Sequence, residues 1–214
     1  ENEFSLNGRS ALITGPNMAG KTAFIRAMGI NLILAQTLGF CLARNAVLPR
    51  SIVKSSIRRE DRLSDGESYF FTEIKQVLDF IQCGQNGPPH VFLIDEIFRG
   101  TNTIERIATA AAVLRHLAQE NIVFATTHDV ELQRMLADTY SMHHFSDRVV
   151  DGKYGFDYLI HPGPVRSRNA IRLLALSGYP ATITEEARKL AAELEAAADK
   201  LKADLPAPTT PLPE

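Results

Sequence analysis

The sequence is poor in cysteine, with only two thiols, Cys41 and Cys83, among its 214 residues. They stand in unrelated contexts and make no pattern of metal ligands. Thiols of this kind fit a reducing cytosol. We therefore expect a cytoplasmic protein in which both cysteines are inert.

A basic excess is also missing. The chain has 23 Lys and Arg against 25 Asp and Glu, a formal net charge of −2. A domain that holds DNA through its own surface usually carries a clear excess of basic residues. We therefore expect any contact with nucleic acid to be made by parts of a longer protein outside this sequence.

No apolar run is long enough to cross a membrane. The longest, Ala27–Ala43, is interrupted by Asn31 and Gln36 and is shorter than the ~20 apolar residues that a membrane-spanning helix needs. It predicts a buried helix instead, and we expect no membrane partner. No signal peptide is visible, but the chain begins at Glu1 without a methionine, so we expect a piece cut from a longer protein.

What is present is the composition of a globular domain, 45% hydrophobic and 22% charged. Short apolar segments alternate with helical patterns, which predicts an α/β fold with a largely parallel sheet. The expected strands are 4–6 and 10–13 as a hairpin, 91–94, 122–126, and an antiparallel pair at 142–148 and 154–160. The expected helices are 21–39, 68–83, 103–119, 129–138, 167–177 and 183–203, while 44–67 should be irregular.

The character of the chain changes at Pro162-Gly163-Pro164. We expect a core over residues 1–163 and a helical segment over 164–204. The remaining tail, 205–214, is rich in proline and threonine and is expected to be disordered.

An apolar segment leads into a complete phosphate-loop motif, and a helix leads out of it. The motif is Gly15-Pro16-Asn17-Met18-Ala19-Gly20-Lys21-Thr22. Its glycines let backbone N–H groups point at phosphate oxygens, and the helix N-terminus adds positive potential. The motif predicts that Lys21 contacts the β- and γ-phosphates of ATP and that the Thr22 hydroxyl binds Mg²⁺. The alternative is an ordinary glycine loop before a lysine.

Two acidic residues, Asp95 and Glu96, directly follow the apolar strand 91–94. Ligands of open α/β sheets bind beyond the carboxyl ends of the strands, and two carboxylates there need a cation or a partner. A Mg²⁺ ion held through water by Asp95 meets that need, and Glu96 can then orient and deprotonate an attacking water. The pair favours hydrolysis, and a structural ion pair with Arg99 is the alternative.

His128 follows the next apolar strand, 122–126, so we expect it at the same edge of the sheet. An imidazole there can hydrogen-bond the γ-phosphate or the attacking water and so register whether ATP is present. Without that position, a histidine in a loop is more often a surface residue.

Ser68 stands at the start of the helix that precedes the acidic strand, after the polar segment 61–67. From the residues alone it is a helix N-cap, with Glu67 and Glu73 favouring the first turns through the helix dipole.

Four segments resemble, in order and spacing, the ATPase domain of the MutS family of DNA mismatch-repair proteins. They are Thr14–Lys21, Asp61–Glu73, Asp95–Thr101 and Thr126–His128. The Gly-Pro-Asn-Met start of the phosphate loop and the Asp-Glu-x-x-Arg-Gly-Thr string are much more specific than generic nucleotide motifs. The resemblance covers roughly residues 6–195.

The resemblance implies an ABC-type P-loop ATPase that sandwiches two ATP molecules in a homodimer. Ser68 would then reach the γ-phosphate bound by the other copy, and Ile97–Thr103 would line the interface. Residues 167–203 resemble the family's C-terminal helix-turn-helix, which joins the dimer. The acidic second helix is a poor surface for DNA phosphates. DNA would be held by upstream domains, and a downstream repair protein would be a further partner.

Four positions depart from the family pattern. Ala19 replaces a usual glycine, Thr22-Ala23 replaces serine-threonine, and Phe98 stands where the best-known members have glycine. The last difference indicates a divergent bacterial paralogue. The family's adenine-stacking aromatic would lie upstream of Glu1.

Two other functions stay open. One is an ABC-type head from chromosome maintenance, although such heads carry long coiled coils where this chain has only residues 23–60. The other is an ATP-gated scaffold with negligible hydrolysis, against which the presence of Glu96 argues.

Overall fold

The computed structural model describes residues 1–6, 8–57, 69–85, 88–98, 101–150, 153–165 and 170–203. By its internal contacts the chain divides into two compact units. One unit comprises residues 1–148 and 156–166, and the other comprises 149–155 and 167–214. The predicted division into a core over residues 1–163 and a helical segment over 164–204 stays a prediction.

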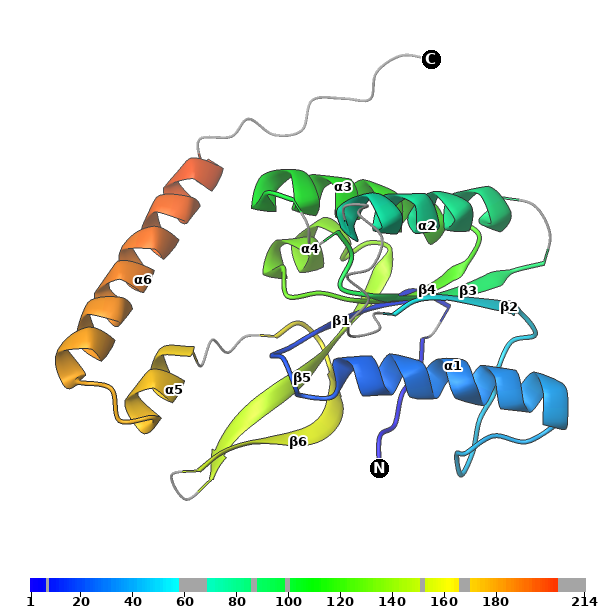
Figure 1. Cartoon of the computed structure of the whole chain (residues 1–214), viewed down its shortest axis with the longest axis horizontal. Coiled ribbons are helices and arrows are strands. Elements are labelled where there is room, and N and C mark those ends of the chain that lie inside the picture. Colours follow the sequence, from blue (N-terminus) through cyan, green and yellow to red (C-terminus); the bar gives the residue numbers. More distant parts are fainter. Residues whose placement is uncertain are drawn as a thin grey trace, which may run out of the picture. The chain divides into compact units, whose positions relative to one another are not determined.

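Six strands form one sheet in the order β2-β3-β4-β1-β5-β6 (Figure 1). Their bounds are β1 Ser10–Thr14, β2 Ile52–Ser56, β3 His90–Asp95, β4 Ile122–Thr126, β5 Tyr140–Val150 and β6 Lys153–Pro162. The four pairings from β2 to β5 are parallel. Only two residues join β5 to β6, too few for a parallel crossover, so this pair is antiparallel. The predicted largely parallel α/β sheet with its antiparallel pair is confirmed.

Helices cover both faces of the sheet. They are α1 Lys21–Leu38, α2 Tyr69–Gly84, α3 Thr103–Leu117 and α4 Val130–Met135. Helix α1 lies on one face, and α2, α3 and α4 lie on the other (Figure 1). Successive strand residues alternate between two buried clusters, so Leu12 and Phe92 pack on the α2–α3 side, whereas Ala11 and Val91 pack on the α1 side. Strands covered on both faces need to be apolar on both faces, as these are.

Glycines set both ends of α1 and its distance from the sheet. Gly20 precedes the helix with φ 110°, and Gly39 ends it with φ 76°. Between them, a Cβ added to Gly29 would clash with Cδ1 of Leu93 on β3. The missing side chain therefore lets α1 pack directly on the sheet. The predicted start and end of this helix are confirmed.

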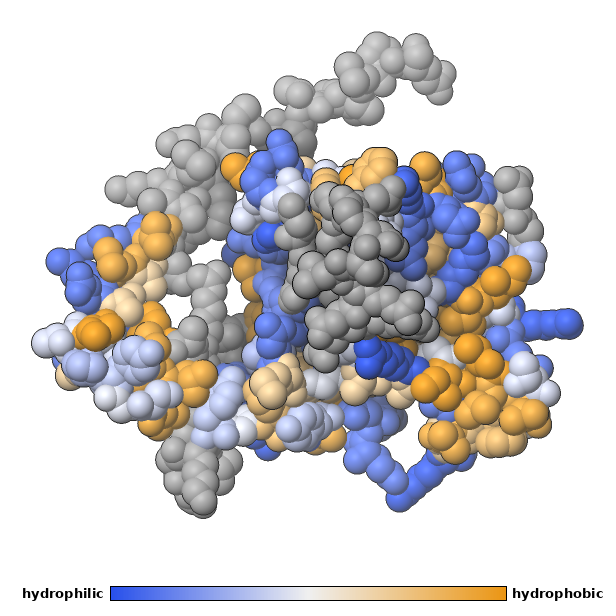
Figure 2. Space-filling model, viewed as in Figure 1, coloured by the Kyte–Doolittle hydropathy of each residue, from blue (hydrophilic) through white to orange (hydrophobic). Residues whose placement is uncertain are grey.

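The prediction that Ala27–Ala43 is buried is wrong. Only one stripe of α1, including Ile25 and Leu32, faces the sheet. Apolar side chains around the C-terminal end of the helix and in the following loop are exposed, and we call them the α1 apolar patch (Figure 2, lower right). The patch consists of Ile30, Ile33, Leu38, Phe40, Leu42 and Val47. Because the run is apolar all round, its sequence does not indicate which face of the helix packs on the sheet and which stays exposed.

The loop that carries part of the patch is tied to the helix. The amide of Leu42 donates to Oδ1 of Asn31 at 2.5 Å, and the amide of Ser51 donates to Oε1 of Gln36 at 2.7 Å. The two polar residues that interrupt the apolar run thus hold the loop against α1.

Two further expectations are wrong. Phe4–Leu6 is not a strand, because β1 already has β4 on one side and β5 on the other. Phe4 and Leu6 pack instead against the α1-side cluster. Residues 44–67 were expected to be irregular, but they contain β2, which pairs with β3 at the edge of the sheet.

Two helices follow the sheet in sequence, α5 Ala170–Leu176 and α6 Ala181–Ala203. In the turn between them Gly178 has φ 83°, and the amide of Tyr179 donates to the Leu174 carbonyl at 3.2 Å. Helix α6 exposes Ile183, Leu190 and Leu194, which lie on one side of it. The two predicted helices are confirmed, and the tail from residue 204 lies outside the described residues. Among the helices that the structure describes, none has the length and apolarity to span a membrane.

Candidate functional site

The Gly15–Thr22 loop joins the carboxyl end of β1 to the N-terminus of α1. Gly15 has φ 135°, and a Cβ there would overlap the carbonyl oxygen of Phe145 on β5. Gly20 adopts the left-handed conformation from which α1 begins. The backbone therefore requires both glycines of the motif. The loop leads into a helix N-terminus, where free N–H groups and the helix dipole favour an anion.

Lys21 is a buried cation, only 5% exposed. Its Nζ donates to the carbonyl oxygens of Gly15 at 2.8 Å and Pro16 at 3.0 Å. The side chain therefore lies back across the loop. Asn17 and Met18 face solvent, Met18 with 85% of its surface exposed and φ 66°, whereas Ala19 is fully buried.

Asp95 lies at the end of β3 and joins the loop to the sheet. One carboxylate oxygen accepts from Thr22 Oγ1 at 2.7 Å, and the other accepts from Thr126 Oγ1 at 2.6 Å. The carboxylate is 8% exposed. Because β3 and β4 are paired in register, Asp95 stands opposite Thr126. The structure thus brings the two predicted metal ligands, Thr22 and Asp95, into direct contact.

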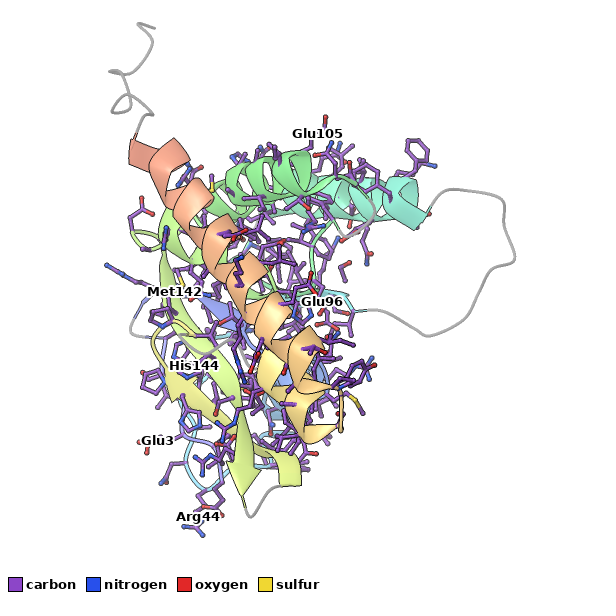
Figure 3. The ribbon with its side chains drawn as sticks, turned by 90° about the vertical axis from the view of Figure 1, so that its left-hand side faces the viewer. Glu3, Arg44, Glu96, Glu105, Met142 and His144 are labelled. Atoms are coloured by element: carbon purple, nitrogen blue, oxygen red, sulfur yellow. The ribbon has the colours of Figure 1, made fainter. Side chains whose placement is uncertain are left out.

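Glu96 and His128 meet at the same edge of the sheet. Oε1 of Glu96 contacts Nε2 of His128, and the Glu96 amide donates to both the carbonyl and the hydroxyl of Thr126. Glu96 has φ 60°, and its side chain is 10% exposed, against 35% for His128. Figure 3 shows Glu96 at the height of the sheet, between the layer of α2 and α3 and the layer of α1. A carboxylate beside an imidazole can accept a proton from a bound water.

A hollow of about 270 Å³ opens beside this pair, lined by Glu96, Ile97, Arg106, Thr127, His128 and Asp129. Arg106 on α3 donates to both carboxylate oxygens of Asp129, at 2.9 and 2.7 Å, and this hydrogen bonding raises the pKa of Arg106. The ion pair clamps α3 to the segment that carries His128.

The sequence did not predict the roles of four residues at this site. Thr126 is hydrogen-bonded to both Asp95 and Glu96. Arg106 and Asp129 form the ion pair between α3 and the His128 segment. Glu73 accepts a hydrogen bond from the Phe98 amide at 2.7 Å. Glu73 was expected to act on the helix dipole. Of these residues only Thr126 could have been identified from the sequence, because it ends the strand next to β3 and so lies opposite Asp95. Ser68 and Arg99 lie outside the described residues, and their predicted roles stay predictions.

The oxygen atoms of Thr22 and Asp95 are of a kind that could hold Mg²⁺. Mg²⁺ prefers oxygen and is usually held by one or two protein groups, with water and substrate phosphates completing its shell. The Thr22 hydroxyl and the Asp95 carboxylate are such a pair. Within the part of the chain that the structure describes, no group of three or more His, Cys, Asp or Glu residues is placed to hold a metal ion.

Comparison with known proteins identifies the family. A family model described as MutS domain V matches residues 11–195. The match covers most of the chain, which therefore belongs to the MutS family. The family predicted from the four sequence segments is confirmed, and the assignment to a divergent paralogue stays a prediction.

Three relatives show the extent of the similarity. The chain is 35% identical over 201 residues to the DNA mismatch repair protein MutS of Geobacillus kaustophilus, covering 90% of this chain and 22% of that protein. It is 34% identical over 190 residues to the protein of the same name from Lactobacillus acidophilus, covering 86% and 22%. It is 30% identical over 192 residues to DNA mismatch repair protein MutS 2 of Haloarcula marismortui, covering 87% and 20%. The chain thus spans about a fifth of the length of these relatives.

Proposed function

We propose that the chain is the ATP-hydrolysing head of a MutS-like protein of DNA mismatch repair or recombination control. One observation carries the proposal: the hydrogen-bonded series Thr22, Asp95 and Thr126 lies beside the Glu96–His128 contact, where the Gly15–Thr22 loop begins α1. Hydrolysis of a nucleotide needs a phosphate cradle, metal ligands and a proton acceptor in one place.

ATP would bind with its phosphates over the Gly15–Thr22 loop. Lys21 already points its ammonium group across the loop, and it would exchange two carbonyl partners for oxygens of the β- and γ-phosphates. Thr22 and Asp95 would hold Mg²⁺, which neutralises charge on the phosphates when bound. With ATP bound in this way, the chain would be a P-loop ATPase of the ABC type.

Glu96 is the proposed proton acceptor. Its carboxylate is nearly buried and contacts His128, so its orientation is fixed before substrate binds. Glu96 would accept the proton of the attacking water, while His128 would hydrogen-bond the γ-phosphate or that water. A positioned general base of this kind contributes about 10²–10⁴-fold to a rate.

Two copies would form a homodimer with two shared ATP sites, each completed by Ser68 of the opposite copy. Helices α5 and α6 would form the helix-turn-helix that joins the dimer, and the exposed stripe on α6 supports a protein contact. DNA would be held by parts of a longer cytoplasmic protein outside this chain, and the names of the relatives support the process of mismatch repair.

Phosphate release from Mg·ATP tests the activity directly. We expect hydrolysis whose specific rate rises with protein concentration, because each site needs two copies. Tight ATP binding without phosphate release would favour the ATP-gated scaffold.

Mixing two variants tests the shared site. Ser68→Ala and Lys21→Ala chains should each be nearly inactive, and a mixed dimer should regain one intact site. The control mixes a Ser68→Ala/Lys21→Ala double variant with the parent chain, where each of the two sites of a mixed dimer carries one defect, so activity should fall as parent chains enter mixed dimers. No rise in the first mixture together with no fall in the control, while mixed dimers form under single-turnover conditions, would contradict a role for Ser68 across the dimer.

A further inference from the structure

Glu73 is a buried carboxylate to which the proposed hydrolysis assigns no role. It lies on α2, is 6% exposed, and accepts a hydrogen bond from the Phe98 amide at 2.7 Å. The other acidic residue of α2, Asp79, differs, because it pairs with Lys54 at the protein surface. Glu73 therefore points into the protein, toward the segment that carries Glu96.

That segment has an unusual backbone. Glu96 and Phe98 both have φ 60°, in the left-handed region that side chains other than glycine rarely adopt. A conformation of this kind persists only when its surroundings hold it. Glycine adopts the same backbone without strain, so a glycine at position 98 would not need to be held.

Helix α2 holds the segment at two points. Glu73 binds its backbone, and Phe70 packs edge-on against the ring of Phe98, with 6.1 Å between ring centroids. Ile97 and Phe98 are each 3% exposed, so the segment is enclosed as well as bonded. Glu96 directly precedes these two residues, and its orientation depends on theirs.

We propose that Glu73 is a positioning residue for hydrolysis: its carboxylate fixes the Glu96–Phe98 backbone and thereby directs the Glu96 side chain toward His128. The inference rests on the proposed role of Glu96 as proton acceptor. Because α2 begins one residue after Ser68, displacement of the helix would reach Glu96 through this hydrogen bond. Glu73 thus links the start of α2 to the acid that activates water.

Two substitutions separate this role from simple support of the fold. Glu73→Leu removes the acceptor, and Glu73→Gln keeps an acceptor oxygen of the same reach. Misplacing a catalytic group by about 1 Å can cost about a hundredfold in rate, so single-turnover hydrolysis should fall ten- to a hundredfold in Glu73→Leu. ATP affinity should stay within about twofold, since the phosphate loop is untouched, and Glu73→Gln should retain most of the rate.

Gln76→Leu is the matched control on the same helix. Gln76 bonds the Ser55 carbonyl and the Ser56 hydroxyl and so ties α2 to β2, without touching residues 96–98. Its loss should leave the hydrolysis rate unchanged. Hydrogen exchange of the Phe98 amide gives a readout without turnover: it should accelerate in Glu73→Leu and not in Glu73→Gln or Gln76→Leu.

A double-variant cycle with Phe98→Gly tests the mechanism. Glycine adopts φ 60° without being held, so Glu73→Leu should cost much less rate in the Phe98→Gly background than in the parent. An equal fold-change in both backgrounds would overturn the proposal. A folded Glu73→Leu variant with parental single-turnover rate, or a Glu73→Gln variant as slow as Glu73→Leu, would also overturn it. If the parent chain hydrolyses no ATP, the proposed function fails instead, and the exchange of the Phe98 amide still tests the holding role.

Discussion

The two ends of α1 differ in what they bury. The N-terminal end buries polar side chains, and the C-terminal end exposes apolar ones. At its N-terminus Lys21 is buried against two carbonyl groups, and Thr22 is bonded to a buried carboxylate. At its C-terminus Leu38 and Phe40 are more than half exposed. Buried charges need partners, and exposed apolar patches mark contact surfaces. One helix therefore has an N-terminal end whose buried polar groups are partnered and a C-terminal end whose apolar side chains are open to contact.

The largest effect is expected from a substitution at the polar end of α1. Glu96→Gln keeps the size and the hydrogen-bonding atoms but cannot accept the proton of water. We expect single-turnover phosphate release to fall by about 10²–10⁴-fold, with ATP binding retained. A near-normal rate would show that another group is the base.

Lys21→Ala comes next. Hydrogen bonds to a charged phosphate are worth about 1.5–3 kcal/mol each, so ATP affinity should fall at least roughly tenfold. The fold should remain, since Nζ donates to two carbonyl groups of the loop rather than packing in the apolar core, and circular dichroism checks this. Lys54→Ala, which removes a lysine paired at the surface, should bind ATP like the parent. Equal affinity of the two variants would remove Lys21 from the site.

Gly29→Ala tests the middle of the helix, between the two ends. A methyl group there meets Leu93, and overpacking typically costs about 1–3 kcal/mol, more than the ~1 kcal/mol that alanine gains in helix propensity. The urea midpoint should fall. Thr37→Ala, on the exposed side of the same helix, gains propensity without crowding and should not lower it. A more stable Gly29→Ala variant would mean that α1 has room to move away from β3.

The smallest effect is expected in the α1 apolar patch. Leu42 is 73% exposed, so Leu42→Ser should change the free energy of unfolding by less than about 0.5 kcal/mol and leave hydrolysis unchanged. Binding of an apolar dye should decrease. The buried counterpart Leu32→Ser should instead be strongly destabilising. A large loss of stability in Leu42→Ser would show that the patch is packed rather than open.

Most of the fold could be predicted because the strands are covered on both faces and read as short apolar runs. The failures have identifiable causes. The Asn7-Gly8 turn predicts a hairpin locally, but both sides of β1 are occupied by strands distant in sequence. Strand β2, with Lys54 and two serines, lies at a half-exposed edge and lacks the apolar pattern.

The candidate site was predicted in part for a similar reason. Lys21, Thr22, Asp95, Glu96 and His128 stand at fixed offsets from strand ends, so their places along the chain put them at one edge of the sheet. The Arg106–Asp129 and Glu73–Phe98 contacts join residues 23 and 25 positions apart. Such pairs depend on how helices pack over loops, and a single sequence carries no pattern for that.

The central place of β1 bears on how the chain folds as it is made. Ala11 pairs with Phe124, and Ser10 pairs with Tyr140, each over a hundred residues later. At ~5–20 residues per second, the phosphate loop leaves the ribosome roughly ten seconds before the strands that must flank it. Gly15 also packs against the backbone of Phe145, which is synthesised later still. A chain stopped before β5 would therefore contain every residue of the motif and yet lack the contacts that give the loop its conformation.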